Sequence, residues 1–387
     1  MARFLLITHI YPPAVDGGSK IIAKTGEYLK LQEHQVLVLT SNCYTSDNFS
    51  KFYKTNLHST PDIIRLPVLT ILHRPLKLIS KLFRNFSVFS KGPIFTYLPI
   101  KKILSFHPDF ILAGPLPTTI VLYVKLICFI TKVLRHYRPK VLVIPCFHPN
   151  DPDFQNILLK KALSRSDFVI ALTETEKKLL GKFTHTNIIV SPLGVDPDFL
   201  INANQISFPK NPNILFIGNF SAHKRFELLI DAFIRLQKIY PQLSLTALGQ
   251  KTLYWPVIEN KIQSTGCKIK FIFNPTRDQL KKAIDVSTML CLPSIHESFG
   301  LVFIESLARG KPVIGANTPQ TSEVLNLIQG GITFKTDNLP DLISKLKFLI
   351  SHPAHSQKLG TKGHRFVKNH FTWDKIEKNL WTKIFSS

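Results

Sequence analysis

Two glutamates eight positions apart are the residues best placed for chemistry. Glu297 follows an apolar run, and Glu305 lies inside another one, beside Ile304. A carboxylate among apolar neighbours is costly to bury unless it accepts hydrogen bonds. Hydroxyl groups of a sugar or of a ribose would donate such bonds. The alternative, in which Glu305 is a solvated helix residue, does not explain its apolar neighbours.

A pair of glycines, Gly17 and Gly18, follows the first apolar run and precedes a helical pattern over residues 20–31. Adjacent glycines at a strand-to-helix turn let backbone amides approach a phosphate, and the helix amino end favours negative charge. A turn that requires positive φ would place glycines there equally well. The complete Gly-x-Gly-x-x-Gly fingerprint of dinucleotide sites is absent, so the sequence does not support a hydride-transfer cofactor.

A second glycine turn is followed closely by cations. Gly218 and Asn219 end an apolar run that starts at residue 214, and the adjacent Lys224 and Arg225 precede another helical pattern. A glycine turn followed by two cations at a helix start suits a diphosphate. An exposed Lys–Arg pair in a lysine-rich protein is the plainer interpretation, and the local sequence favours neither.

The elements that position these residues follow one pattern along the chain. Short β-branched or aromatic runs alternate with longer helical patterns, which is typical of parallel sheets covered by crossover helices. The pattern restarts after a polar segment, so we place a domain boundary near residues 194–212. Ligands bind open α/β sheets at the carboxyl ends of their strands, which is where the residues above lie. The predicted strands are 3–8, 35–40, 63–66, 110–113, 140–145, 168–172 and 188–191, then 214–217, 244–248, 269–273, 288–292 and 312–315.

Composition excludes several classes of protein. The 387 residues are 44% hydrophobic and 19% charged, as in a globular protein and unlike a disordered one. Five scattered cysteines without a Cys-x-x-Cys pair argue against a disulfide framework or a zinc site. Residues 1–9 are interpreted as a buried strand rather than a signal peptide, and the longest apolar stretch is interrupted by prolines and lysines. We therefore expect a protein that is soluble or lies on a membrane.

Two Asp-Pro-Asp sequences, at 151–153 and 196–198, have the spacing of a metal-binding Asp-x-Asp pair. Proline between the two carboxylates suits a turn as well as it suits chelation. We interpret both as turns and predict no essential metal ligand.

Surface charge is the most unusual property of the sequence. Lys and Arg number 49 and Asp and Glu 25, a formal net charge of +24, so an anionic partner is expected. Residues 63–150 hold 13 Lys or Arg and a single acid, Asp109. Within them, residues 76–89 form a basic amphipathic pattern that suits either an anionic membrane surface or ordinary packing against the first sheet. Nucleic-acid binding would also use such charge, but no recognised motif accompanies it.

Taken in order, these segments resemble retaining nucleotide-sugar glycosyltransferases of the GT-B fold, specifically glycosyltransferase family four. The most specific element is the Glu-x7-Glu motif from Glu297 to Glu305, and residues 191–196 and 218–224 are similar to family segments in the same order. The resemblance implies two Rossmann-like doubly wound domains that face each other across a cleft. The acceptor-binding domain would be residues 1–195, joined by a C-terminal helix at 371–387, and the donor-binding domain residues 196–370.

The resemblance also implies roles for residues of the second domain. Glu297 would contact hydroxyls of the donor sugar, and Glu305 would contact the ribose of the nucleotide. The amides of Phe299, Gly300 and Leu301 would cradle the sugar and the phosphate at a helix amino end.

Further implied roles concern the diphosphate. Lys224, after the turn at Gly218, would neutralise the leaving group as the glycosidic bond breaks. From the first domain, Gly17 and Gly18 would close over the same diphosphate, and His148 would lie near the donor sugar.

Two departures from the family pattern affect the donor site. Asn219 stands where the family usually has Arg, so one cation on the diphosphate is missing unless Arg225 replaces it. Residues 318–322, before Glu323, lack the glycines that the family often has there. Neither departure removes the two carboxylates or Lys224, so we expect an active enzyme.

For the reaction, the resemblance implies transfer of a sugar from a nucleoside-diphosphate sugar to a lipid-linked or saccharide acceptor. The donor would be a UDP-sugar or a GDP-sugar. With the leaving group and the acceptor on the same face of the sugar, retention of anomeric configuration needs no enzyme nucleophile, and no cofactor is expected. If the basic helix lies on an anionic membrane, a role in cell-envelope polysaccharide or glycolipid synthesis at the cytoplasmic face is expected. The alternatives are a sugar-nucleotide epimerase or a phosphorylase on the same fold. Glycosidase chemistry is rejected because about 12 Å of helical rise would separate Glu297 from Glu305.

Overall fold

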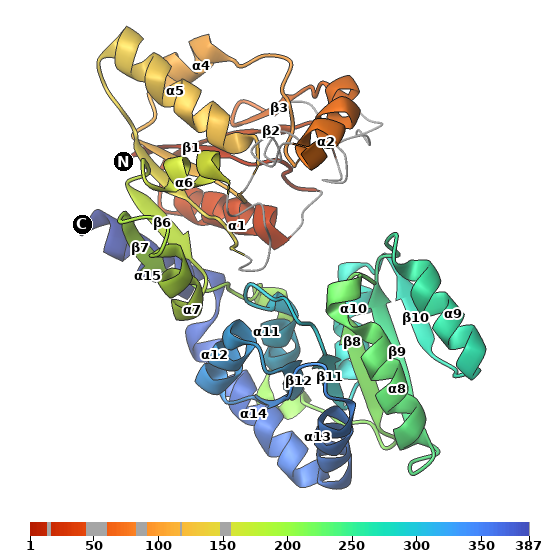
Figure 1. The fold of residues 1–387 in the computed structure, drawn as a ribbon. Coiled ribbons are helices and arrows are strands. Elements are labelled where there is room, and N and C mark those ends of the chain that lie inside the picture. The colour runs from red at the N-terminus through yellow and green to blue at the C-terminus, as the bar shows by residue number, and fades with distance from the viewer. Residues whose placement is uncertain (14–16, 44–59, 83–90, 117, 148–155, 387) are drawn as a thin grey trace. The chain divides into compact units, whose positions relative to one another are not determined.

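The computed structural model describes residues 1–387 except 14–16, 44–59, 83–90, 117, 148–155 and 387 (Figure 1). Its internal contacts divide the chain into unit 1, Met1–Ser191 with Glu377–Ser387, and unit 2, Pro192–Ile376. These boundaries lie a few residues from the expected ones at 195 and 371. The reason is that the Val195 N–H donates to the Phe371 carbonyl oxygen at 2.6 Å, which ties both segments to unit 2.

Unit 1 contains a seven-stranded parallel sheet in the order β3-β2-β1-β4-β5-β6-β7. Its strands are rich in Leu, Ile and Val and are buried on both faces, which is typical of a parallel sheet covered by helices. All seven were predicted from the sequence to within two residues at each end. They are β1 (Arg3–Ile7), β2 (Gln35–Ser41), β3 (Ile63–Leu66), β4 (Phe110–Ala113), β5 (Lys140–Val143), β6 (Phe168–Ala171) and β7 (Asn187–Val190).

The helices of unit 1 include one from the end of the chain. In α15 (Trp373–Phe385), Trp381 is 2% exposed and packs edge-on against Phe4 of β1, with ring centroids 5.0 Å apart. The C-terminal helix therefore completes the first domain, as expected. The other helices are α1 (Gly17–Leu31), α2 (His73–Leu82), α4 (Ile100–Phe106), α5 (Ile120–Arg135), α6 (Ile157–Leu163) and α7 (Glu174–Leu180), with the 3-10 turn η1 (Thr70–Leu72).

Helix α2 covers the first part of the predicted basic amphipathic segment, and residues 83–90 of that segment lie outside the described part of the chain. Leu78 is 64% exposed and Leu82 76% exposed. The alternative in which this apolar stripe packs against the sheet is therefore wrong for these residues. An apolar surface is instead left facing solvent on α2.

Unit 2 contains a six-stranded parallel sheet in the order β10-β9-β8-β11-β12-β13. The sequence predicted all but β13, whose four residues are preceded by glycine and carry only two large apolar side chains. This strand pairs with β12 in parallel and extends the sheet at one edge. The strands are β8 (Asn213–Ile217), β9 (Ser244–Gly249), β10 (Lys270–Phe273), β11 (Met289–Leu292), β12 (Val313–Ala316) and β13 (Gly331–Phe334).

Helices cover the sheet of unit 2, and the segment before β8 is held to them by a buried lysine. Lys311 is 1% exposed, donates to the carbonyl oxygen of Ser207 and lies 4.6 Å from the ring centroid of Phe208. Burial lowers the pKa of Lys311 to about 8. The helices are α8 (Phe226–Gln237), α9 (Trp255–Thr265), α10 (Arg277–Asp285), α11 (Leu301–Ala308), α12 (Pro319–Ile328), α13 (Leu339–Ser351) and α14 (Pro353–His370), with 3-10 turns η4 (Pro197–Phe199), η5 (Ala203–Gln205) and η6 (Ala222–Lys224).

Both units are thus α/β structures with parallel sheets, as the alternation of strand and helix patterns predicted. Among the helices that the structure describes, none has the length and apolar character needed to cross a membrane.

Candidate functional site

The loops after β8 and β11 meet at the carboxyl edge of the unit 2 sheet. The two strands are neighbours, with Leu290 paired to Leu215. Beyond them, the N–H of Ile295 donates to the carbonyl oxygen of His223 at 2.9 Å, and the buried Ser294 hydroxyl donates to the same oxygen at 3.3 Å. These bonds fix one loop against the other, so residues about 70 positions apart in sequence share one site.

Lys224 and Glu297, both predicted site residues, form an ion pair across these loops. Their side chains are 17% and 11% exposed, so the pair is largely removed from water. Attraction between charges is stronger in such surroundings than at an exposed surface. Glu297 therefore holds the Lys224 ammonium in place at the mouth of the site, where it can meet an anion.

Helix α11 begins directly after the β11 loop and points an uncapped amino end into it. Gly300, with φ 83°, is the N-cap residue and has no side chain with which to cap the helix. A Cβ on Gly300 would overlap the ring of Phe303, so only glycine fits. The first amides of a helix lack intrahelical partners and carry partial positive charge, which favours an anion.

The start of α11 differs slightly from the sequence interpretation. The helix starts at Leu301 rather than Phe299, because Gly300 adopts a left-handed conformation that ends the loop. Residues 297–300 are therefore not helical, and the helical rise used to separate Glu297 from Glu305 does not describe this pair. Phe299 lies in the loop before the helix and is buried, with its ring centroid 6.0 Å from that of Phe371.

Glu305 lies one turn into α11 and is 5% exposed. The alternative in which it is a solvated helix residue is therefore wrong. Its neighbours Ile304 and Ser306 are fully buried as well, so this part of α11 lies in the interior of unit 2. A buried carboxylate in this position requires hydrogen-bond donors.

The two other cation-related positions are arranged differently. Asn219 is exposed at the end of the β8 turn. Arg225, which could have replaced the missing cation, forms an ion pair with Asp337, with Nε 2.9 Å from Oδ1. Glu323, the third acidic position, lies within α12, after the N-cap Thr318. Arg225 is thus committed to a partner away from Lys224 in this conformation.

The predicted residues of the first domain belong to unit 1. Gly17 and Gly18 form the first turn of α1 and have no positive φ, so the interpretation as a positive-φ turn is wrong. A Cβ on Gly18 would lie 2.7 Å from Pro115, so this glycine allows a close approach of two segments. His148 lies outside the described residues, as does the Asp-Pro-Asp sequence at 151–153.

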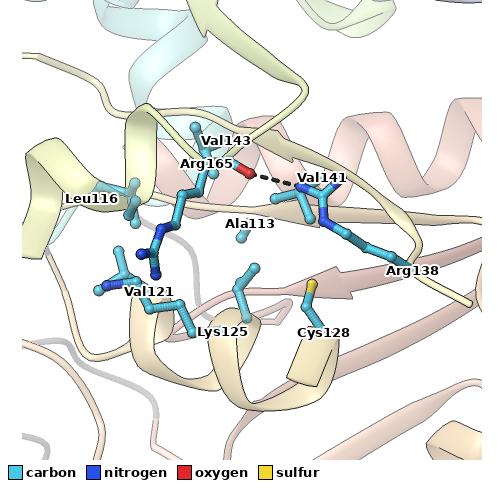
Figure 2. A pocket seen from close by; sticks show the side chains of 11 residues that line it. Ala113, Leu116, Val121, Lys125, Cys128, Arg138, Val141, Val143 and Arg165 are labelled. Carbon is cyan, nitrogen blue, oxygen red and sulfur yellow. Dashed lines mark hydrogen bonds between the residues drawn. The ribbon is translucent and has the colours of Figure 1, made fainter. Parts of the chain in front are cut away.

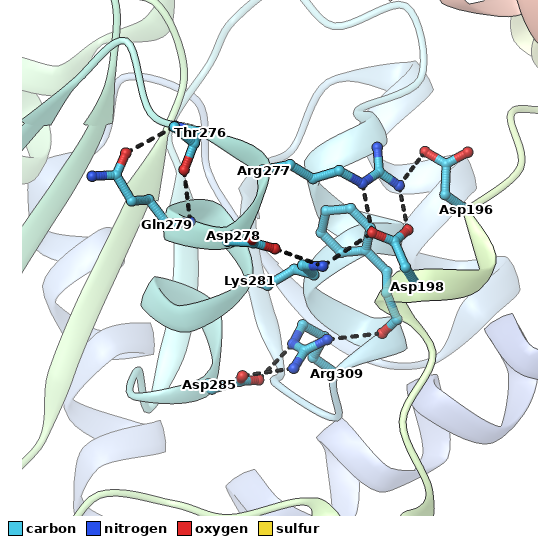
Figure 3. Close-up of polar contacts among 10 residues, drawn as sticks. Asp196, Asp198, Thr276, Arg277, Asp278, Gln279, Lys281, Asp285 and Arg309 are labelled. Atoms are coloured by element: carbon cyan, nitrogen blue, oxygen red, sulfur yellow. Dashed lines mark hydrogen bonds and ion pairs between the residues drawn. The ribbon is translucent and has the colours of Figure 1, made fainter.

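The second Asp-Pro-Asp sequence forms an ion-pair network with α10 (Figure 3). Arg277 donates from Nε to Asp198 at 2.6 Å and lies 2.7 Å from Asp196, and Lys281 donates to Asp198 at 3.1 Å. The hydrogen bond from Arg277 lowers the pKa of Asp198 far below its usual range. Both carboxylates therefore serve as anchors of the turn at η4.

Sequence reasoning missed the residues that join the two loops. Ser294 is 1% exposed and also donates to the His296 carbonyl oxygen at 3.1 Å, and the rings of His223 and His296 lie 6.4 Å apart. The available signal for Ser294 was its position directly after Pro293, close to the end of a predicted strand. The adjacency of the two histidines depends on strand order, which the local sequence does not reveal.

Sequence comparison points to one family. Residues 199–366 match the family model described as "Glycosyl transferases group 1". The match supports a group 1 glycosyltransferase. A curated relative from Haemophilus influenzae, described as an uncharacterized glycosyltransferase, is 26% identical over 216 residues, which cover 56% of this chain and 60% of that relative. The alignment thus spans about three fifths of the relative's length and does not extend the family description to the whole protein.

Comparison with solved structures concerns the fold. The chain is similar over 100% of both chains to sucrose-phosphate synthase from Thermosynechococcus elongatus, with a TM-score of 0.74 and 19% identity. It is also similar over 100% of both chains to HepE from Anabaena, solved in complex with UDP-glucose, with a TM-score of 0.72 and 14% identity. These matches confirm the GT-B fold class expected from the sequence.

Proposed function

We propose that the protein is a retaining glycosyltransferase of family four that transfers a sugar from a nucleoside-diphosphate sugar. The observation that carries the proposal is the Lys224–Glu297 pair beside the uncapped amino end of α11. A diphosphate needs a cation and backbone N–H donors, and a sugar needs carboxylate acceptors. This edge of the unit 2 sheet offers both within two hydrogen-bonded loops. A structural neighbour that was solved with UDP-glucose adds support.

In the proposed reaction, charge develops on the diphosphate as the glycosidic bond breaks. Lys224 and the amides at Gly300 and Leu301 are placed to stabilise that charge. Glu297 would release part of its hold on Lys224 and accept hydrogen bonds from the donor sugar. Glu305 would accept bonds from the ribose hydroxyls. The acceptor oxygen would then bond to the anomeric carbon on the face that the diphosphate leaves, and the acceptor's hydroxyl proton would pass to the leaving phosphate oxygen. Configuration is thus retained without a protein nucleophile.

The proposal is tested by thermal stabilisation with UDP, GDP and ADP and their sugars. A ligand that binds only the folded state raises the melting temperature, by a stabilisation of about 2.7 kcal/mol at a hundred times its Kd. Lys224→Met and Glu305→Gln should each reduce the shift given by the preferred diphosphate. The matched controls are Lys238→Met, at the C-cap of α8, and Glu259→Gln, on α9, because both side chains are exposed.

Each outcome decides between distinct interpretations. A shift with one nucleoside diphosphate that only the two site variants diminish supports the donor site and identifies the base. The absence of a shift with every nucleotide would contradict the proposal and indicate that Asn219 marks a lost donor site.

Transfer is distinguished from epimerisation and phosphorolysis by the fate of the diphosphate. A transferase releases free nucleoside diphosphate when an acceptor is supplied. An epimerase converts the sugar while it stays attached, and a phosphorylase requires inorganic phosphate. Mixtures of the donor with candidate saccharide and lipid-linked acceptors, followed by chromatography of the nucleotide, therefore separate the three activities.

For the acceptor, we propose a lipid-linked or saccharide substrate reached from an anionic membrane surface on the cytoplasmic side. Support comes from the exposed apolar residues Leu78, Ile79 and Leu82 on α2, within a segment of strongly basic composition. Apolar residues beside cations are the features that place a helix on anionic lipid. Co-sedimentation with anionic vesicles should be strong at low salt and weak at high salt. No binding at low salt would contradict the membrane part alone.

A further inference from the structure

A cavity lies in unit 1, between two helices and the sheet (Figure 2). Its volume is about 170 Å³. Helix α5 forms one wall, the end of α6 forms another, and β4 and β5 form the floor. Most of the lining is apolar, and none of the described lining residues is acidic. They are Ala113, Leu116, Val121, Val124, Lys125, Cys128, Arg138, Val141, Val143, Ala162 and Arg165.

Three cations border this apolar cavity. Arg138 is already engaged, because it donates to Asp167 at 3.0 Å and to the carbonyl oxygen of Arg165 at 2.7 Å. Lys125 and Arg165 are different, because no described residue forms a hydrogen bond or ion pair with the Lys125 ammonium or the Arg165 guanidinium. Figure 2 shows both side chains extending toward the same side of the pocket. The pocket therefore combines an apolar interior with two uncompensated positive charges.

The arrangement is electrostatically unfavourable as it stands. Burial lowers the pKa of Lys125, and the nearby charges of Arg165 and Lys161 lower it further. Like charges that converge on one place repel each other unless an anion lies between them. A charged ligand at this position would remove that repulsion and gain charge-assisted hydrogen bonds.

The cavity itself has the size of a short hydrocarbon chain. An apolar cavity of about 150 Å³ in another protein accommodates benzene. By that measure, this cavity holds a chain of about six to eight carbon atoms. The walls offer branched aliphatic side chains and the Cys128 thiol, whose pKa burial raises to about 11, so the thiol is neutral.

We propose that this pocket binds an anionic amphiphile, with a hydrocarbon chain in the cavity and a phosphate or carboxylate group held by Lys125 and Arg165. The site is independent of the proposed donor site, because its residues all belong to unit 1 and none of them is assigned to the donor. It is nevertheless connected to the glycine turn of unit 1. Leu116 lines the pocket, and Pro115 beside it lies against Gly18.

The first experiment is titration calorimetry on the full chain with four probes below their micelle concentrations. Octyl phosphate and octanoate carry both chain and charge, octanol carries the chain alone, and inorganic phosphate carries the charge alone. At least one of the two charged amphiphiles should bind about tenfold more tightly than octanol and phosphate, because charge-assisted hydrogen bonds and burial of the chain both contribute. The better of the two identifies the head group. Equal binding of octanol, or equal binding of inorganic phosphate, would overturn the proposal.

A matched pair of variants on α5 tests the charge. Lys125→Met should weaken binding of the preferred amphiphile about tenfold. Lys132→Met removes the same charge from an exposed position on the same helix and should leave binding unchanged. Equal weakening by both would show that the amphiphile responds only to overall charge, which overturns the proposed site.

Chain length tests the cavity in the unmodified protein. In a series of alkyl phosphates or of fatty carboxylates from four to eight carbons, whichever head group is preferred, affinity should rise about fourfold for each added methylene that is buried. Beyond about eight carbons, the gain should diminish, because the chain outgrows the cavity. Ala162→Phe fills the cavity from α6 and should remove the dependence on chain length. An unbroken rise past twelve carbons in the wild type would indicate an open surface instead of this pocket and would overturn the assignment.

Discussion

The two units differ in what their charged residues are paired with. In unit 2, 22 Lys or Arg accompany 13 Asp or Glu, and several acids hold loops in place: Glu297 with Lys224, Asp198 with Arg277, and Asp285 with Arg309. In unit 1, 27 Lys or Arg accompany only 12 acids. Its Lys30–Asp62 ion pair is exposed at both side chains.

This difference indicates which charged side chains pair within the chain and which are available to a partner. In unit 2, the Lys224–Glu297 pair lies between the two loops of the candidate donor site. Many cations of unit 1 have no acid to pair with, so the anions that balance them must come from outside the chain. Unit 1 must accordingly be held together by apolar packing. The following predictions test this contrast in order of decreasing effect.

The largest effect is expected from Trp381→Ala in unit 1. Trp381 fills the space against Phe4 and donates to Glu377 at 3.0 Å, so its loss creates a cavity and breaks a buried hydrogen bond. We expect a loss of about 3 to 5 kcal/mol in the free energy of unfolding. Calorimetric melting measures it. Phe385→Ala on the same helix, where the side chain is 51% exposed, is the control and should cost far less.

Gly300→Ala should have the next largest effect, on unit 2. The substitution adds strain at φ 83° and forces a Cβ into the Phe303 ring, and together these should cost about 2 to 4 kcal/mol. Gly266→Ala is the matched control, because Gly266 has φ 63° but nothing within 4 Å of its Cβ position. It should cost only about 1 kcal/mol. Equal costs measured by urea unfolding would show that the packing of the α11 start is not tight.

Arg277→Ala should cost about 2 kcal/mol, because Asp196, with a side chain 4% exposed, loses its guanidinium partner. The comparison in unit 1 is Lys30→Ala, which breaks an exposed pair and should change stability by less than about 1 kcal/mol. Urea unfolding of both variants measures the contrast directly. Similar losses would break the distinction between the ion pairs of the two units.

The smallest effect is expected from Glu377→Gln and depends on pH. Burial raises the pKa of Glu377 from 4.5 to about 7, opposed by hydrogen bonds from Thr25 and Trp381. The folded state therefore binds more protons than the unfolded state between these values, so stability is complete below pH 4.5 and falls as pH rises through 7. Glu377→Gln should match the wild type at pH 5 and exceed it by about 2 kcal/mol at pH 8.

Thermal unfolding from pH 5 to pH 8 checks this prediction. Glu259→Gln, at an exposed position, should retain the wild-type dependence on pH. A Glu377→Gln variant that loses stability with rising pH as the wild type does would show that Glu377 is ionised in the folded protein throughout this range.

The fold could be predicted from sequence because its strands carry an unambiguous local signal. β1 and β11 are short runs of large apolar residues bounded by polar or turn-forming ones. β13 was missed because Gly331-Ile-Thr-Phe334 carries only two large apolar side chains. A strand can be predicted from sequence where consecutive large apolar residues mark it, and β13 has no such run.

The structure brings two of the predicted site residues together through connections that the sequence did not reveal. Lys224 and Glu297 were both singled out, but their mutual ion pair depends on β8 and β11 being neighbours. The partner of Arg225, Asp337, is more than a hundred positions away. The pocket beneath α5 could not be foreseen at all, because a cavity is set by the space left between helices and carries no pattern of its own.

Helix α15 has a consequence for how the protein is made. The chain leaves unit 1 after Ser191 and returns only at Glu377, when all of unit 2 has passed. On the ribosome, unit 2 can therefore fold as a continuous segment. Phe4 of β1 lacks its contact with Trp381 until the end of the chain has been synthesised. Residues 1–191 produced alone would lack this cover and should aggregate. Unit 1 can therefore be completed only after unit 2 has been synthesised.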